Sequence, residues 1–175
     1  MKCTLIIPAW EPEEIFPTKT GASQVNYWQP LGTRSVAASL QKAGHEVEFL
    51  NGAFLSNTEI LQAVKTSTPD FIGLYSTTFG WPKAKKTAQE IKTILPNVFI
   101  TVGGPYPIAL QEQCLKDCIW IDAVVTGEGE ITAVSMVEKL ANGKTLDGVK
   151  GVAFRESLKI IKNHPQPLIT DLEVL

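Results

Sequence analysis

The sequence is poor in residues that mark several common classes of protein. Its 175 residues include three cysteines and two histidines, which do not make a disulfide framework. The net charge of −2 gives no electrostatic reason to expect nucleic acid or an anionic membrane as a partner. No apolar run approaches the ~20 residues of a membrane span, and the opening run "CTLIIPAW" is too short for a signal peptide. We therefore expect a cytoplasmic protein.

The cysteines do not indicate a metal centre. Cys3 lies in an apolar run and is predicted to be a core thiol. Cys114 and Cys118 are one helical turn apart, but no nearby Cys or His completes a ligand set. A Cys-x3-Cys-x2-Cys cluster motif would need a cysteine where Ile121 stands. We expect neither a metal site nor catalytic residues in this chain.

Short apolar runs instead alternate with helical stretches along most of the chain. The patterns predict strands over residues 3–8, 46–50, 70–75, 98–102 and 122–125. Helices are predicted over 31–43, after a capping box at 56–59, and over 82–95, 108–116 and 130–140. Several strands are apolar throughout, as in a sheet that is covered on both faces. The alternation predicts a doubly wound α/β fold with five parallel strands and helices on both faces.

The C-terminal part has a different pattern. "GVAFR" and "LKIIK" predict a β-hairpin whose turn is at Glu156 and Ser157, although these residues lack the usual turn chemistry. "HPQPLITDLEVL" is expected to be an extended exit segment because its prolines disfavour helix. The predicted division is an α/β domain over 1–148 and a hairpin with linker over 149–175.

Ligands of such sheets bind at the carboxyl ends of the strands, where this chain carries "STTFGW", "GGPYP" and "TGEGE". A dinucleotide or flavodoxin-type phosphate loop would need glycine after the first strand, and "PAWEPEE" stands there. The carboxylates of Glu128 and Glu130 would repel a pyrophosphate. Glycines without a Cβ and three small hydroxyl residues instead suit a flat, uncharged ring. The alternative is that these glycines only make tight turns.

At these residues the chain resembles a known family. The ordered segments "QPLGTRSVAASLQKAGHEVEFLN", "PDFIGLYSTT", "VGGPYP", "DAVVTGEGE" and "GVAFR…DLEVL" are similar to the cobalamin-binding domain that precedes the barrel of cobalamin-dependent radical S-adenosylmethionine (SAM) enzymes. The resemblance implies a flavodoxin-like, Rossmann-like sheet with cobalamin at its carboxyl edge. It also implies that the loop through Trp28 to Gly32 lies near the corrin. The cofactor-binding residues that it implies are Ser76, Thr77, Thr78, Gly103, Gly104, Pro105, Tyr106, Gly127, Glu128 and Gly129.

The sequence lacks a cobalt-ligating histidine motif, and this absence bears on how the cofactor is expected to bind. The Asp-x-His-x-x-Gly motif, whose histidine ligates cobalt in other cobalamin proteins, does not occur here. His45 and His164 are expected to be structural, so the cofactor would be bound base-off without a protein histidine on cobalt.

The parent enzyme implied by the resemblance is a radical SAM methyltransferase or cyclase. Its S-adenosylmethionine and 4Fe-4S cluster would be bound by a domain that this chain lacks, so the chain is expected to be a fragment that catalyses nothing alone. Two alternatives remain. Tyr75 and Tyr106 could fill the cleft of a cofactor-free interaction domain, or the chain could be an enzyme acting on a nucleotide.

Overall fold

The computed structural model describes residues 1–10 and 30–170. Five strands run parallel in the order β2-β1-β3-β4-β5. Their bounds are Lys2–Ile7 (β1), Glu46–Asn51 (β2), Phe71–Tyr75 (β3), Phe99–Gly103 (β4) and Ala123–Val125 (β5). This order is flavodoxin-like, and it reverses direction between β1 and β3, where such sheets bind ligands. The predicted parallel sheet is confirmed.

The predicted hairpin also forms, and it extends the same sheet. β6 (Val152–Glu156) pairs antiparallel with β5, and β7 (Lys159–Lys162) pairs antiparallel with β6, which makes seven strands. The two-residue turn is at Ser157 and Leu158, one position later than predicted. Ser157 adopts a left-handed conformation with φ 54°, the kind of conformation that a tight hairpin turn requires.

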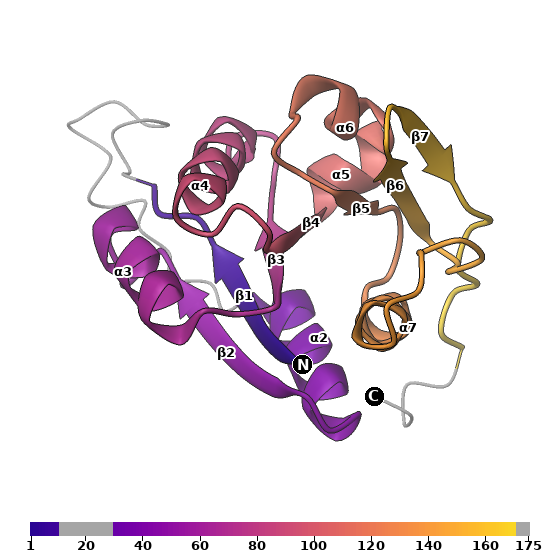
Figure 1. Cartoon of the computed structure of the whole chain (residues 1–175), viewed down its shortest axis with the longest axis horizontal. Helices are drawn as coiled ribbons and strands as arrows, with labels where there is room; N and C mark the ends of the chain where they lie inside the picture. The colour runs from indigo at the N-terminus through magenta and orange to yellow at the C-terminus, as the bar shows by residue number, and fades with distance from the viewer. Residues whose placement is uncertain (11–29, 171–175) are drawn as a thin grey trace.

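Helices cover both faces of the sheet, as predicted (Figure 1). α2 (Leu31–Lys42) and α7 (Glu130–Ala141) pack on one face, with residues such as Leu40 and Met136 in a cluster with Leu5 and Phe71. The other face is covered by α3 (Asn57–Ser67), α4 (Trp81–Ile94), α5 (Pro105–Leu110) and α6 (Gln113–Asp117). Successive strand residues point to opposite faces, so each strand contributes to both clusters.

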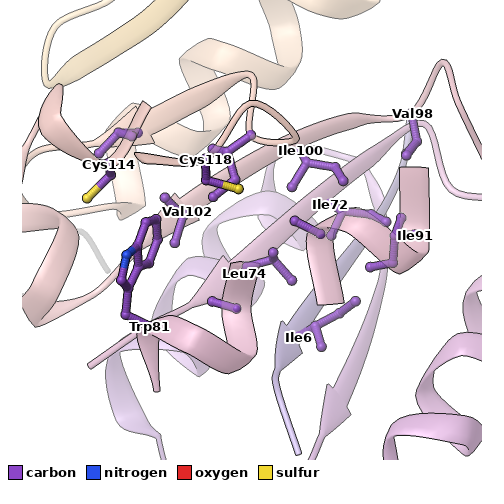
Figure 2. Packing of buried hydrophobic residues seen from close by; sticks show 14 of the residues in the cluster. Ile6, Ile72, Leu74, Trp81, Ile91, Val98, Ile100, Val102, Cys114 and Cys118 are labelled. Atoms are coloured by element: carbon purple, nitrogen blue, oxygen red, sulfur yellow. The ribbon is translucent and has the colours of Figure 1, made fainter. Parts of the chain in front are cut away.

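The core under α4 and α6 also contains two of the cysteines. Figure 2 shows Cys114 and Cys118 beside Trp81, with Ile100 and Val102 of β4 near them. Burial raises the pKa of the Cys114 thiol to about 11 and raises the pKa of Cys118. Cys3 is fully buried in the opposite cluster, which confirms the prediction of a core thiol.

Local sequence signals explain where helices begin. The predicted capping box starts α3: the Ser56 amide donates to the Glu59 carboxylate at 2.8 Å, and the Glu59 amide donates to the Ser56 hydroxyl at 3.3 Å. Pro82 lies in the first turn of α4, where its missing amide costs nothing.

The single helix predicted over 108–116 is wrong. The chain forms α5 and α6 instead, and Gln111 breaks them apart with φ 49° while its amide donates to the Pro107 carbonyl at 2.7 Å. The prediction failed because apolar residues continue at helical spacing across the break. Ile108 and Leu110 belong to that pattern, yet they are 42% and 38% exposed.

Candidate functional site

A cavity of about 1000 Å³ opens at the carboxyl edge of the parallel strands. Tyr75 at the end of β3 and Phe71 at its start both line it. At about 3.3 Å per residue, the cavity therefore follows β3 for about 13 Å. Its inner part lies on the sheet face that α2 and α7 cover. Val36 of α2 and Ala133 of α7 belong to its lining.

We call this inner part the channel. Its walls come from four strands (β1, β3, β4 and β5) and two helices (α2 and α7) on one side of the sheet. The channel residues are Leu5, Val36, Phe71, Gly73, Thr101, Val125 and Ala133. All seven line the space between the sheet and the helices α2 and α7. The channel can therefore accept a flat group that enters from the carboxyl edge of the strands, which we call the rim.

Two glycines of the lining lie close to neighbouring residues, and one of them, Gly104, cannot carry a side chain without strain. A Cβ on Gly73 would lie 2.6 Å from Leu5 Cδ2, the end of a flexible side chain in the channel wall, so the Leu5 side chain would have to shift. Gly104 has φ 107°, and a Cβ there would lie 2.7 Å from the Ser76 carbonyl oxygen and 3.0 Å from the Tyr75 ring. Any side chain at position 104 would therefore strain the backbone and meet the β3 end.

Most of the residues implied by the family resemblance do meet at this cavity. Seven of the ten line it, and they come from the ends of β3, β4 and β5. They are Thr77, Gly103, Gly104, Pro105, Gly127, Glu128 and Gly129.

The other three, Ser76, Thr78 and Tyr106, are not among the lining residues. Ser76 is buried, and its hydroxyl donates to the Thr77 carbonyl at 3.0 Å. The Tyr106 ring stacks on Trp81 with centroids 5.0 Å apart, on the face that α4 covers. Tyr106 therefore does not fill the cleft, whereas Tyr75 is part of its wall.

Sequence reasoning missed the channel itself. Leu5, Phe71, Thr101 and Val125 look like ordinary strand residues, and only their shared face makes them neighbours. One signal was available, because a glycine inside a strand, such as Gly73, often marks a close approach of ligand or backbone. Pro30, Leu31 and Gly32 of the expected corrin-facing loop also line the cavity, while residues 28–29 fall outside the described residues.

Charge is confined to the rim. Among the described lining residues, the charged ones are Lys83, Glu128 and Glu130, all near the strand ends. One oxygen of the Glu128 carboxylate accepts a hydrogen bond from the Ile169 amide at 2.8 Å. This bond connects the exit segment to the turn that contains Glu128 and Glu130, which we call the acidic corner.

Both histidines lie away from the lining. His45 precedes β2, at the opposite end of the sheet, with Nδ1 3.4 Å from the N-terminal nitrogen. Burial and that amino group lower its pKa. His164 is exposed, and its carbonyl accepts a hydrogen bond from the Gly151 amide at 2.8 Å. Neither imidazole is positioned in the cavity.

The described residues hold no group of three or more His, Cys, Asp or Glu side chains that is arranged for a metal ion. In the same part of the chain, no helix combines the length and the apolar character needed to cross a membrane.

Comparisons with known proteins agree on one family. The sequence model described as "B12 binding domain" matches residues 17–137. An uncharacterized methyltransferase of Pyrococcus horikoshii is 32% identical over 99% of this chain and 37% of its own length. The anaerobic magnesium-protoporphyrin IX monomethyl ester cyclase of a Synechocystis species is 35% identical over 83% of this chain and 30% of its own length.

A solved structure shares the fold. The cobalamin-dependent S-adenosylmethionine radical enzyme OxsB, with aqua-cobalamin and S-adenosylmethionine bound, superposes with a TM-score of 0.78 at 20% identity. The match covers 96% of this chain and 23% of that one. This chain spans about a third of the length of the two curated relatives from Pyrococcus horikoshii and Synechocystis.

Proposed function

The chain belongs to the B12 binding domain family, and we propose that it holds cobalamin with the nucleotide tail in the channel and the corrin ring over the rim. The observation that carries the proposal is the channel: a narrow apolar space that begins among glycines and continues about 13 Å along β3. Its cavity volume of about 1000 Å³ lies in the range of ligand pockets.

The residues present fit such a cofactor. The backbone at Gly103 and Gly104 can approach a flat ring because no Cβ intervenes. Gly129 also allows α7 to begin close to α2, since a Cβ there would lie 2.8 Å from Val36 Cγ2. The tail base would lie between the sheet face and these helices, and the aromatic and aliphatic walls would exclude water from it.

The acidic corner also suits this ligand. The corrin ring carries amide side chains, whose N–H groups are hydrogen-bond donors. The carboxylates of Glu128 and Glu130 can accept from such donors at the rim. A corner that would repel a pyrophosphate is therefore appropriate for a ligand fringed with amides.

We further propose that the cofactor is bound base-off and without a histidine ligand from this chain. A base that occupies the channel cannot coordinate cobalt at the same time. The positions of His45 and His164, outside the cavity lining, support the absence of an imidazole ligand. Bound cobalamin would supply a cobalt centre that can carry a methyl group or exchange electrons, and this chain would supply the binding and orientation.

The names of the relatives support a larger assignment. We propose that the chain serves a radical SAM methyltransferase or cyclase, with S-adenosylmethionine and a 4Fe-4S cluster held by another domain. Residues 149–175 would connect the domain over 1–148 to that part. The full-length polypeptide is then expected to contain a Cys-x3-Cys-x2-Cys motif, and a full-length sequence without it would contradict this assignment.

Gel filtration and electron paramagnetic resonance together test the binding proposal. The protein is incubated with hydroxocobalamin, separated from free ligand, and reduced to the cobalt(II) state. We expect one equivalent of corrin to elute with the protein and its spectrum to lack the splitting that an axial nitrogen causes. No retained corrin would contradict cobalamin binding. Retained corrin that shows nitrogen splitting would contradict only the base-off, histidine-free mode.

A further inference from the structure

We propose that the channel selects the base of the nucleotide tail, favouring a methylated benzimidazole over a purine. The inference rests on the proposed function, because it concerns the group that would enter the channel. It specifies which class of cobalamin analogue the site accepts. The selectivity would follow from how few polar groups the channel offers to a buried base.

The channel offers few hydrogen-bonding partners. Six of its seven residues have no polar side-chain atom, and the exception is Thr101. Thr101 is buried, and its hydroxyl donates to the Ala123 carbonyl at 3.1 Å. The main chains of β1, β3, β4 and β5 pair in one ladder, which uses the backbone groups between strands. Apart from the acceptor lone pairs of the Thr101 hydroxyl, the inner channel therefore offers no side-chain hydrogen-bond partner to a base that needs several.

The two classes of base differ in that need. A dimethylbenzimidazole presents a hydrocarbon edge with two methyl groups, which matches walls such as Leu5 and Val125. An adenine presents an exocyclic amine and several ring nitrogens instead. A buried polar group without a partner costs about 1–3 kcal/mol, so the adeninyl analogue should bind about 5- to 150-fold more weakly.

Three ligands separate this effect from binding in general. Dissociation constants are measured by corrin absorbance for hydroxocobalamin, its adeninyl analogue, and cobinamide, which lacks the nucleotide base. Each value is corrected for the ligand's own base-off equilibrium, obtained by pH titration of the free ligand. We expect cobalamin to bind most tightly, the adeninyl analogue about 5- to 150-fold more weakly, and cobinamide most weakly.

A matched pair of variants localises the effect. Val125→Thr adds a hydroxyl to the channel wall with little change of shape. It should narrow the difference between the two bases by about 2- to 10-fold, the value of one hydrogen bond. Val102→Thr makes the same change at a buried position on the opposite sheet face. It should leave the affinity ratio unchanged, and melting curves of both variants report their folding.

The affinities of the three ligands distinguish failure of the selectivity from failure of binding. Equal affinity for the two bases, or tighter binding of the adeninyl analogue, would overturn the selectivity and leave cobalamin binding intact. A ratio altered equally by Val125→Thr and Val102→Thr would overturn the role of the channel. No binding of any of the three ligands would overturn the proposed function and the selectivity together.

Discussion

Filling the channel from Gly103 should abolish tail binding without unfolding the protein. Gly103 ends β4, has no positive φ, and would place a Cβ 3.8 Å from Val125 Cβ, an ordinary contact distance. The backbone therefore tolerates a side chain there. A phenylalanine would project to the channel side of the sheet, and strand propensity favours it over glycine.

The expected loss follows from the area that the tail buries. A flat ring of aromatic size buries about 150–250 Å², which at about 25 cal/mol per Å² amounts to about 4–6 kcal/mol. If Gly103→Phe forfeits only half of this, affinity for cobalamin still falls at least about 30-fold. The variant should bind cobalamin no more tightly than cobinamide.

Corrin absorbance titration and thermal melting measure the two properties separately. Lys159→Phe is the matched control, because it puts the same side chain on an exposed strand position of β7, outside the cavity lining. It should bind cobalamin like the unaltered protein. A Gly103→Phe protein that melts normally and binds cobalamin with unchanged affinity would refute the reasoning. Gly104 is a poorer site for this test, since any side chain there strains the backbone.

Three further predictions concern the histidines, Asp117 and the cysteines. Replacing either His45 or His164 with alanine should leave the spectrum of bound cobalamin unchanged, and a shifted cobalt spectrum in either variant would contradict the absence of a histidine ligand. Hydrogen bonds from Trp81 and Lys85 hold the pKa of Asp117 below its ordinary value of 3.8. The ionised Asp117 carboxylate therefore contributes its full stabilisation above pH 3.8. That stabilisation is lost as pH falls through the lowered pKa of the folded state. Asp117→Asn should therefore destabilise the fold by up to about 1 kcal/mol at pH 7, and urea titrations should show this difference shrinking below pH 3.8; a difference independent of pH would oppose the assignment. All three cysteines are buried, and burial raises the pKa of Cys3 and Cys114 to about 11. At pH 8 they should react with a thiol reagent at least about 100-fold more slowly in the native protein than in urea. Fast labelling of the native protein would show instead that these thiols are accessible.

The fold could be predicted largely because local signals and apolar runs agree. The Ser56 capping box, Pro82 in the first turn of α4 and the apolar β3 each indicate one structure. Prediction failed where local pattern and tertiary packing diverge. The helical spacing after Ile108 continues past the left-handed break at Gln111, and nothing in the hairpin residues indicates that β6 would pair with β5.

The site could be predicted in part. Glycines at the ends of neighbouring parallel strands, such as Gly103 and Gly127, must meet at one edge, and strand order alone brings them together. The channel could not be predicted in this way, because it depends on which strand residues face α2 and α7. Tyr106 illustrates the same limit. It follows the cavity residue Pro105 directly, yet α5 turns its ring toward Trp81 and away from the cavity.

The most direct test of the central claim is a crystal structure of the protein with cobalamin bound. The tail should be seen between the sheet and the helices α2 and α7, with its base beside Gly73 and Thr101 and the corrin over the rim near Gly104. A base that remains coordinated to cobalt outside the channel, or a channel closed by side chains of this chain, would contradict it.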